Sequence, residues 1–218
     1  GSIGARHIVT HYNPDACIIG EPSGFDGVTL GYKGRLLCKA TVQCSNAHSA
    51  GAELSAPDIA FQWWTQLSSL VDSLNTDYDN IFDQVQASIL SMDSSSNGLS
   101  QYAEVLCGFR LPTTVQAIEL QEHIESVLPN LVCCEFSGSE NAYLTDRNDP
   151  VVRALTSSIR SMGHTPRPKR KTGTADLNVV APIWRCPIAA YGPGDSSLDH
   201  TPQEHLQVDH YHESIKIL

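Results

Sequence analysis

Polar and hydrophobic residues alternate, or recur at helical spacing, along the middle of the chain. Between Arg35 and Cys44 every second residue is apolar, which predicts a strand with one buried face. Between Pro57 and Leu74 the apolar residues recur at the spacing of one helix face. The pattern continues with a strand at Phe82–Met92, a strand at Tyr102–Leu111, a helix at Val115–Leu128 and a strand at Leu131–Phe136. The resulting order is the ferredoxin-like pattern, which predicts a domain of its own.

The segments that flank this pattern contain fewer recognisable elements. A short apolar run at Asp15–Ile19 predicts a buried strand. A helix is expected to begin at Pro150, with Asp149 as its N-cap, and to end at Gly163. The run Pro187–Tyr191 predicts one further strand, and neither flank is a domain by itself.

These patterns together predict an α/β protein with an insertion. We expect residues 1–28 and 145–218 to form the second half of an α/β sheet domain whose first half is absent. Residues 29–144 are expected to form the inserted ferredoxin-like (βαββαβ) domain. Hydrophobic residues make up 41% of the chain and charged residues 17%, a composition that supports a buried core. No apolar run approaches the ~20 residues of a membrane-spanning helix, so no membrane partner is expected.

Charge and cysteine content narrow the possible partners and the compartment. The chain has 14 Lys and Arg against 24 Asp and Glu, a net charge of −10. This acidity argues against DNA or RNA as a main partner, because phosphate neutralisation requires basic patches. The seven cysteines are odd in number and contain no Cys-x-x-Cys pair, which favours reduced thiols in a cytoplasmic protein over cysteine-ligated zinc.

Two candidate sites follow predicted strands. Glu21, in Gly-Glu-Pro-Ser-Gly, would lie at the carboxyl edge of a strand, where open α/β sheets place their sites, although acidic residues are also common in turns. His200 follows a Gly-Pro-Gly loop and stands between Asp199 and Glu204. Its imidazole suits Zn²⁺, Co²⁺ or Mn²⁺, or it is a surface loop histidine. A serine hydrolase is not predicted, because no Gly-x-Ser-x-Gly elbow occurs.

Three further segments carry weaker signals. His48 lies in a loop of small residues, where it could donate to a developing oxyanion or remain a solvated turn histidine. The backbone amides of Lys171–Asp176 could cradle an anion. Arg110 could bind a carboxylate in bidentate fashion, although a surface arginine is commoner. We interpret the basic run Lys169–Lys171 as a solvated strand edge.

Six motifs occur in an order that is more specific than any one of them. They are Gly-Glu-Pro-Ser at 20–23, Gly-Tyr-Lys-Gly-Arg at 31–35, Ala-His-Ser at 47–49, Phe-Arg-Leu-Pro at 109–112, Thr-Gly-Thr-Ala-Asp at 172–176 and Asp-His-Thr-Pro-x-Glu at 199–204. This series resembles the two-zinc aminoacylase and carboxypeptidase family of acetylornithine deacetylase, succinyl-diaminopimelate desuccinylase and glutamate carboxypeptidase. The runs 28–37, 171–178 and 191–205 look most similar to the deacetylases of N-acetyl-lysine and N-acetylornithine in carrier-protein-linked lysine or ornithine biosynthesis.

The resemblance implies a set of roles. Glu21 would be a carboxylate ligand of one metal ion and His200 a histidine ligand of the other, with two Zn²⁺ or Co²⁺ ions per site. His48 would reach into the partner subunit's site and stabilise the tetrahedral oxyanion. The residues expected to hold the α-carboxylate of an N-acyl amino acid substrate are Arg110, Thr172, Gly173 and Thr174. The inserted domain would be a lid and a homodimerisation module.

The chain also departs from the family. It has no His-x-Asp motif and no adjacent acidic pair, which supply further ligands and the general base in the family. Because those elements precede the Glu21 motif there, we expect this chain to be the C-terminal part of a longer metallo-amidohydrolase. We expect it to be inactive alone and to hold divalent metal weakly or not at all. Gly108 stands where the family often has Asp or Asn. The alternative function is a non-catalytic dimerisation or partner-binding module.

Overall fold

The computed structural model describes residues 2–46 and 53–218, and the chain divides into two compact units. The outer unit comprises Gly1–Lys33 and Ala142–Leu218, and the inserted unit comprises Gly34–Asn141. The division falls a few residues from the boundaries expected from the sequence. In the described ranges, no helix has the length and apolar character needed to cross a membrane.

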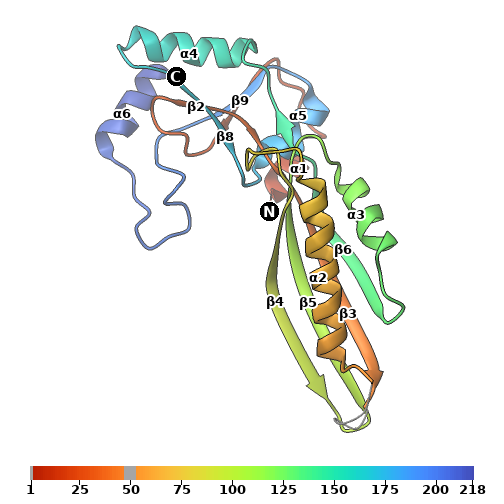
Figure 1. The fold of residues 1–218 in the computed structure, drawn as a ribbon. Coiled ribbons are helices and arrows are strands. Elements are labelled where there is room, and N and C mark those ends of the chain that lie inside the picture. The colour runs from red at the N-terminus through yellow and green to blue at the C-terminus, as the bar shows by residue number, and fades with distance from the viewer. Residues whose placement is uncertain (1, 47–52) are drawn as a thin grey trace. The chain divides into compact units, whose positions relative to one another are not determined.

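The inserted unit has the predicted order of elements. They are β3 (Gly34–Ser45), α2 (Ala56–Leu74), β4 (Gln86–Ser96), β5 (Ser100–Leu111), α3 (Ala117–Ser126) and β6 (Val132–Glu140). The strands form an antiparallel sheet in the order β4-β5-β3-β6, and α2 and α3 pack against it (Figure 1). This is the ferredoxin-like arrangement, with the first strand of the unit at an inner position of the sheet.

Alternation along the strands produces the core of the inserted unit. Leu36, Cys38, Ala40 and Val42 of β3 are buried with the inward face of β5, as the sequence predicted. Helix α2 contributes Trp63 to this core and begins at the capping box formed by Ser55 and Asp58. The predicted helices and strands of this unit are therefore confirmed as elements.

The β4 strand differs from its prediction. It was expected at Phe82–Met92 but spans Gln86–Ser96. Phe82 and Val85 are buried ahead of the strand, whereas most residues of β4 are exposed. The apolar residues that suggested the earlier start thus pack as part of the preceding loop, and the serine-rich segment after Met92 continues the strand.

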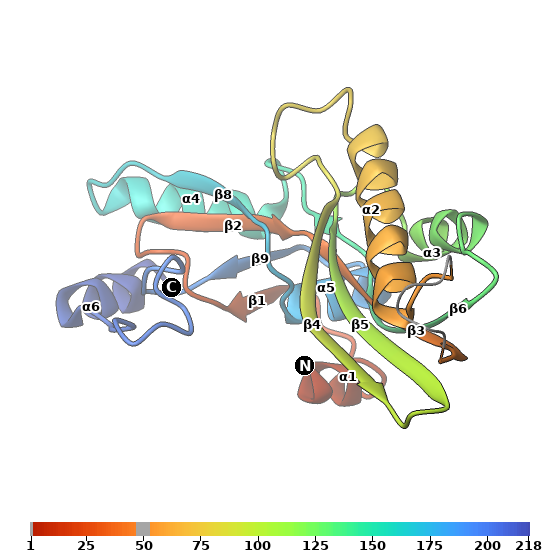
Figure 2. The same cartoon turned by 60° about the horizontal axis from the view of Figure 1, so that its bottom comes forward.

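The outer unit contains more elements than its sequence pattern predicted. They are α1 (Ile3–Ile8), β1 (Cys17–Gly20), β2 (Gly27–Tyr32), β7 (Tyr143–Leu144), α4 (Pro150–Ser161), β8 (Arg167–Lys171), α5 (Asp176–Trp184), β9 (Ile188–Tyr191) and α6 (Val208–Ile217). The strand order is β1-β9-β2-β7, and β8 also pairs with β2 (Figure 2). The sheet is mixed, because β1 and β9 are parallel and β2 is antiparallel to β9.

Helices cover the two faces of this sheet. Residues of α1 and α5 share a core with Ile188 and Ala190, and residues of α4 and α6 share another core with Ala189 and Tyr191. All four residues of β9 are therefore buried, on alternating faces. The predicted α4 is confirmed, with Asp149 accepting hydrogen bonds from the amides at the helix start.

The strand at the edge of the outer sheet corrects the sequence prediction. β1 was expected to be buried, but within the described chain it pairs only with β9, and Ile18 is 44% exposed. A parallel strand that is apolar throughout is typical of a position covered on both faces. The sequence therefore identified the strand correctly, but its burial is incomplete among the residues described.

Candidate functional site

Two of the sequence motifs meet at the carboxyl end of the β1–β9 pair. Glu21 follows β1 directly, and the Gly-Pro-Gly loop of residues 192–194 follows β9. The amide of Ser23 donates to the carbonyl of Gly192 at 2.9 Å, and the amide of Gly24 donates to that of Gly194 at 2.9 Å. A Cβ atom at position 192 would lie 2.9 Å from the carbonyl oxygen of Glu21, so this close approach requires glycine.

Ser23 fastens the Glu21 turn to the sheet. Its side chain is fully buried, and its hydroxyl lies 2.8 Å from that of Thr29 on β2. The same oxygen is 3.2 Å from the carbonyl oxygen of Glu21 and 3.3 Å from that of Ala190 on β9. Because a buried hydroxyl needs such partners, the turn is held in one position relative to β2 and β9.

The carboxyl group of Glu21 is half-buried and surrounded by charges from three other segments. Burial raises the pKa of Glu21, and the carboxylates of Asp176 and Asp199 raise it further. The positive charges of Lys171 and His200 act in the opposite direction and lower this pKa. The structure thus brings Glu21, the Asp199–His200 pair and the segment around Lys171 into one electrostatic neighbourhood.

Lys171 is a member of this neighbourhood that the sequence did not identify. Its ammonium group donates to the carbonyl of Pro22 and lies 5.6 Å from the centre of the Tyr32 ring. Burial lowers the pKa of Lys171, whereas Asp199 and Glu21 raise it. The interpretation of residues 169–171 as a solvated strand edge is therefore incomplete for Lys171, which is partly buried and whose ammonium group lies near the Glu21 turn and the Tyr32 ring.

Tyr32 is the second residue that sequence reasoning missed. Its side chain is buried, and its hydroxyl makes no hydrogen bond of regular geometry in the part of the chain that the structure describes, although the Thr29 hydroxyl is close enough to lower the pKa of Tyr32. Burial raises the pKa of Tyr32, and the carboxylates of Glu21 and Asp199 raise it further. The phenol is therefore neutral and retains a donor beside Glu21. The Gly-Tyr-Lys-Gly-Arg motif at 31–35 contains this tyrosine, but its position near the Glu21 turn depends on which strands become neighbours.

The loop that carries His200 is shaped by its own polar side chains. His200 is exposed and has a left-handed backbone with φ of 62°, and its amide donates to the Glu204 carboxylate at 2.9 Å. The Ser197 hydroxyl donates to the Asp195 carboxylate at 2.8 Å. The hydroxyl of this serine is thus engaged by an acid of its own loop.

The described residues do not make a complete metal site. Within residues 2–46 and 53–218, no three His, Cys, Asp or Glu side chains are grouped closely enough to hold a metal ion. Glu21 and His200 provide two donors of the right chemical type, but zinc sites use three or four protein ligands. The assignment of both residues as ligands therefore stays a prediction.

The small-residue loop of Thr172–Thr174 joins β8 to α5. The Asn178 side chain accepts a hydrogen bond from the Ala175 amide at 2.9 Å and donates to the carbonyl of Lys33 at 3.2 Å. These contacts anchor the end of the loop and cap the helix. Thr172 is exposed and the next two residues are partly exposed, so the loop is accessible, and its role in carboxylate binding remains a prediction.

The remaining candidates belong to the inserted unit. Arg110 on β5 is in register with Arg35 on β3, and burial together with the Arg35 charge lowers the pKa of Arg110. A Cβ atom at Gly108 would lie 3.0 Å from the Leu90 side chain, which occupies the space beside this glycine. His48 lies outside the described residues. The carboxylate-binding role of Arg110 and the oxyanion role of His48 stay predictions.

Comparison with known proteins covers the whole chain. Residues 1–218 match peptidase family M20/M25/M40. The chain is 41% identical over 221 residues to the LysW-lysine hydrolase of Deinococcus radiodurans, an alignment that covers 100% of this chain and 61% of that protein. It is 24% identical over 226 residues to the LysW-lysine/LysW-ornithine hydrolase of Saccharolobus solfataricus, covering 99% of this chain and 60% of that protein.

Solved structures share the fold at low sequence identity. A tripeptidase from Staphylococcus aureus has a TM-score of 0.75 and 16% identity, covering 100% of this chain and 59% of its own. An M20 family metallo-carboxypeptidase from Sulfolobus solfataricus has a TM-score of 0.74 and 16% identity, covering 99% of this chain and 64% of its own. The chain thus spans less than two thirds of the length of these proteins. Because the family match extends over all 218 residues, the chain belongs to peptidase family M20/M25/M40.

Proposed function

We propose that this chain is part of a metal-dependent amidohydrolase that releases lysine or ornithine from an N-acyl derivative. The observation that carries the proposal is the hydrogen-bonded pairing of the Glu21 turn with the Gly192–Gly194 loop, which leads to His200. This pairing places a carboxylate and an imidazole near each other at the carboxyl end of parallel strands, a usual position for α/β sites. The names of the relatives in Deinococcus and Saccharolobus support lysine and ornithine as the released amino acids.

Metal chemistry enters the proposal through the family. Its members typically use a pair of zinc or cobalt ions, and such ions polarise a carbonyl and make water a nucleophile at neutral pH. In our proposal Glu21 and His200 each contribute one ligand, to different ions. The other ligands and the general base would come from residues outside this sequence, since the chain covers only 61% of the Deinococcus relative.

The substrate-binding residues are proposed from the family resemblance. Arg110 and the amides of Thr172–Thr174 would bind the α-carboxylate, because guanidinium groups and oriented amides are effective carboxylate donors. His48 would donate to the developing oxyanion. Tyr32, whose neutral hydroxyl retains a donor near Glu21, is available for a polar group of the substrate or for an ordered water.

The inserted unit is proposed to be the lid and homodimerisation module. In support, β4 pairs with β5 on one side only among the described strands, and its other edge is open. Ile89, Leu90 and Met92 of this strand are exposed apolar residues. An open strand edge with exposed apolar side chains tends to associate with another chain. Two-fold pairing of identical chains is the commonest way to cover such an edge.

Activity assays with and without the segment proposed to supply the other ligands and the general base test the proposal. The 218-residue chain should not hydrolyse N-acetyl-lysine or N-acetylornithine, even with added Zn²⁺ or Co²⁺. Addition of the upstream segment of the same gene, in cis or as a separate polypeptide, should restore turnover. In the restored enzyme His200→Ala should lower metal content and abolish hydrolysis, whereas the matched control His205→Ala, in the same exposed loop, should retain both.

The oxyanion role has a separate signature. His48→Ala in the restored enzyme should lower kcat by about 10²–10³ and leave the metal content unchanged, as expected for loss of one oxyanion donor. Hydrolysis by the isolated chain would contradict the assignment of an incomplete site. A restored enzyme that holds both metals but remains inactive would instead favour the non-catalytic dimerisation module.

A further inference from the structure

The net negative charge of this chain comes from one unit. The inserted unit has 3 Lys and Arg against 13 Asp and Glu, whereas the outer unit has 11 of each. Half of the cations in the whole chain, 7 of 14, fall between residues 147 and 171, where Asp149 is the sole acidic residue. The carboxylate of Asp149 accepts hydrogen bonds from the backbone amides of Val151 and Ile188, so it already has partners within the fold.

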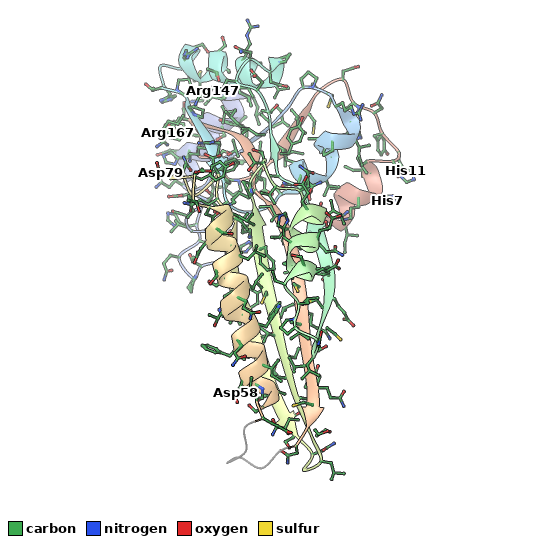
Figure 3. The ribbon with its side chains drawn as sticks, turned by 45° about the vertical axis from the view of Figure 1, so that its right-hand side comes forward. His7, His11, Asp58, Asp79, Arg147 and Arg167 are labelled. Carbon is green, nitrogen blue, oxygen red and sulfur yellow. The ribbon has the colours of Figure 1, made fainter. Side chains whose placement is uncertain are left out.

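This basic segment encloses a groove. The groove has a volume of about 800 Å³ and is lined by α4 and by the chain that leads into β8. Its lining includes the arginines Arg147, Arg153 and Arg160, and Pro166 and Pro168 line it from the segment that contains the start of β8. Arg147 precedes α4, and Arg167 opens β8 in the same part of the outer unit (Figure 3).

The three arginines of the groove are exposed and lack ion-pair partners among the described residues. Arg167, by contrast, is neutralised by Asp26. Arg153 and Arg160 are seven residues apart on one helix, about 10 Å along its axis. A chain that bears several carboxylates can pair with guanidinium groups that start from such separated positions.

We propose that the groove between α4 and β8 is a docking surface for an acidic polypeptide, with Arg147, Arg153 and Arg160 pairing with carboxylates of the partner. Arginine forms bidentate pairs with carboxylates and is enriched at the energetic centres of protein interfaces. The rigid proline wall lowers the entropy lost on binding. Pro168 lacks an amide donor, so recognition occurs through side chains and not by adding a strand to β8.

The charge balance favours a protein partner over a nucleic acid. Affinity for DNA comes mainly from phosphate contacts, about six to ten of them in a strongly salt-dependent complex, and three free arginines on a chain of net charge −10 provide fewer. Complementary charge on a protein partner accelerates association and orients it without that number of contacts. This inference is independent of the proposed hydrolase activity, because none of the three arginines belongs to the Glu21 neighbourhood.

Fluorescence anisotropy with a labelled oligo-glutamate peptide tests the proposal on the full chain. At low ionic strength we expect saturable binding that weakens as salt is added. The triple variant Arg147→Gln/Arg153→Gln/Arg160→Gln should weaken binding by at least about tenfold. The corresponding triple Lys variant keeps the charge and should lose less affinity, and Arg185→Gln, an exposed arginine outside the groove, should bind like the wild type.

Other outcomes would overturn the proposal. No peptide binding at low salt, or equal binding by the wild type and the triple Gln variant, would exclude the groove as the docking surface. Tighter binding of a duplex DNA oligonucleotide than of the peptide would assign it to nucleic acid. Self-association that the triple Gln variant abolishes would assign it to a second copy of this chain. Unfolding curves that match the wild type would show that the variants remain folded.

Discussion

The two units of this chain bury their hydrophobic residues in different ways. The inserted unit has strands of 9 to 12 residues with helices against one face, and its buried side chains form one core. The outer unit has strands of two to six residues and helices on both faces, and its buried side chains form two smaller cores. Stability is therefore concentrated in side-chain packing in the inserted unit. In the outer unit it depends more on individual hydrogen bonds between short segments.

The largest expected effect is on the core of the inserted unit. Trp63 is 0% exposed and lies between α2 and the sheet. Trp63→Ala should destabilise the unit by about 3–5 kcal/mol, through lost burial and the cavity that remains. Urea denaturation followed by circular dichroism measures this loss. Phe61 on the same helix is 63% exposed, so Phe61→Ala should change stability by less than about 0.5 kcal/mol.

Ser23 tests the dependence of the outer unit on single hydrogen bonds. Ser23→Ala removes the hydroxyl that links the Glu21 turn to Thr29 and Ala190, and should cost about 1–3 kcal/mol because a buried polar group loses its partner. Hydrogen exchange of the β9 amides, measured by mass spectrometry, should accelerate. Ser197→Ala, at an exposed serine of the neighbouring loop, is the control and should leave that exchange unchanged. Equal protection in both variants would show that packing alone holds the turn.

The inserted unit could be predicted from sequence because burial on one side of a strand or helix produces a regular spacing of apolar residues. The alternation in β3 and the apolar face of α2 both follow from burial on one side. β4 was displaced in the prediction because Phe82 and Val85 are apolar residues of a packed loop. Sequence periodicity reports burial and does not distinguish a strand from a loop that packs onto the core.

The outer unit gave weaker signals for a physical reason. β2 is buried along its whole length, with two glycines, so it shows no alternation and was missed. α5 was missed because nearly all of its first five residues are apolar or buried and Pro182 stands within it. The basic run of β8 was interpreted only as a solvated strand edge, because its place inside the sheet comes from pairing with β2.

The candidate site shows the same division. Glu21 and the Asp199–His200 pair were found because they belong to short motifs next to glycine and proline. Lys171 and Tyr32 were missed, since their proximity to Glu21 depends on the pairing of β2 with β8. Which residues share a site depends on the tertiary structure, and a single sequence does not show which residues become neighbours.

An intermediate effect is expected at the start of α4. The Asp149 carboxylate accepts hydrogen bonds from the amides of Val151 at 2.8 Å, Val152 at 3.4 Å and Ile188 at 3.3 Å. Asp149→Ala should destabilise the outer unit by about 0.5–2 kcal/mol, the usual cost of an N-cap. Asp149→Asn keeps an acceptor and should recover most of this loss in urea denaturation. Equal destabilisation by both variants would mean that the charge of Asp149, and not its hydrogen bonds to the helix start, stabilises the outer unit.

The smallest expected effect concerns Glu213 on α6, a partly exposed residue whose contacts should contribute little compared with those of the buried Ser23. Its carboxylate lies 2.7 Å from the Lys216 ammonium and 3.3 Å from the His164 ring nitrogen. Lys216 and His164 lower the pKa of Glu213, so the folded state binds fewer protons than the unfolded state in acid. The contribution of Glu213 is thus fully present above the ordinary pKa of a glutamate and is lost as the pH falls through the lowered value.

Thermal unfolding of wild type and Glu213→Gln across this pH range measures that contribution. The wild type should have the slightly higher midpoint at neutral pH, and the difference should vanish in acid, where both side chains are neutral. High salt should reduce the difference, because exposed charges are screened. Glu122→Gln, on the exposed face of α3 in the inserted unit, controls for the loss of a surface charge. A difference that persists unchanged into acid would show that Glu213 acts through packing or hydrogen-bond geometry and not through its charge.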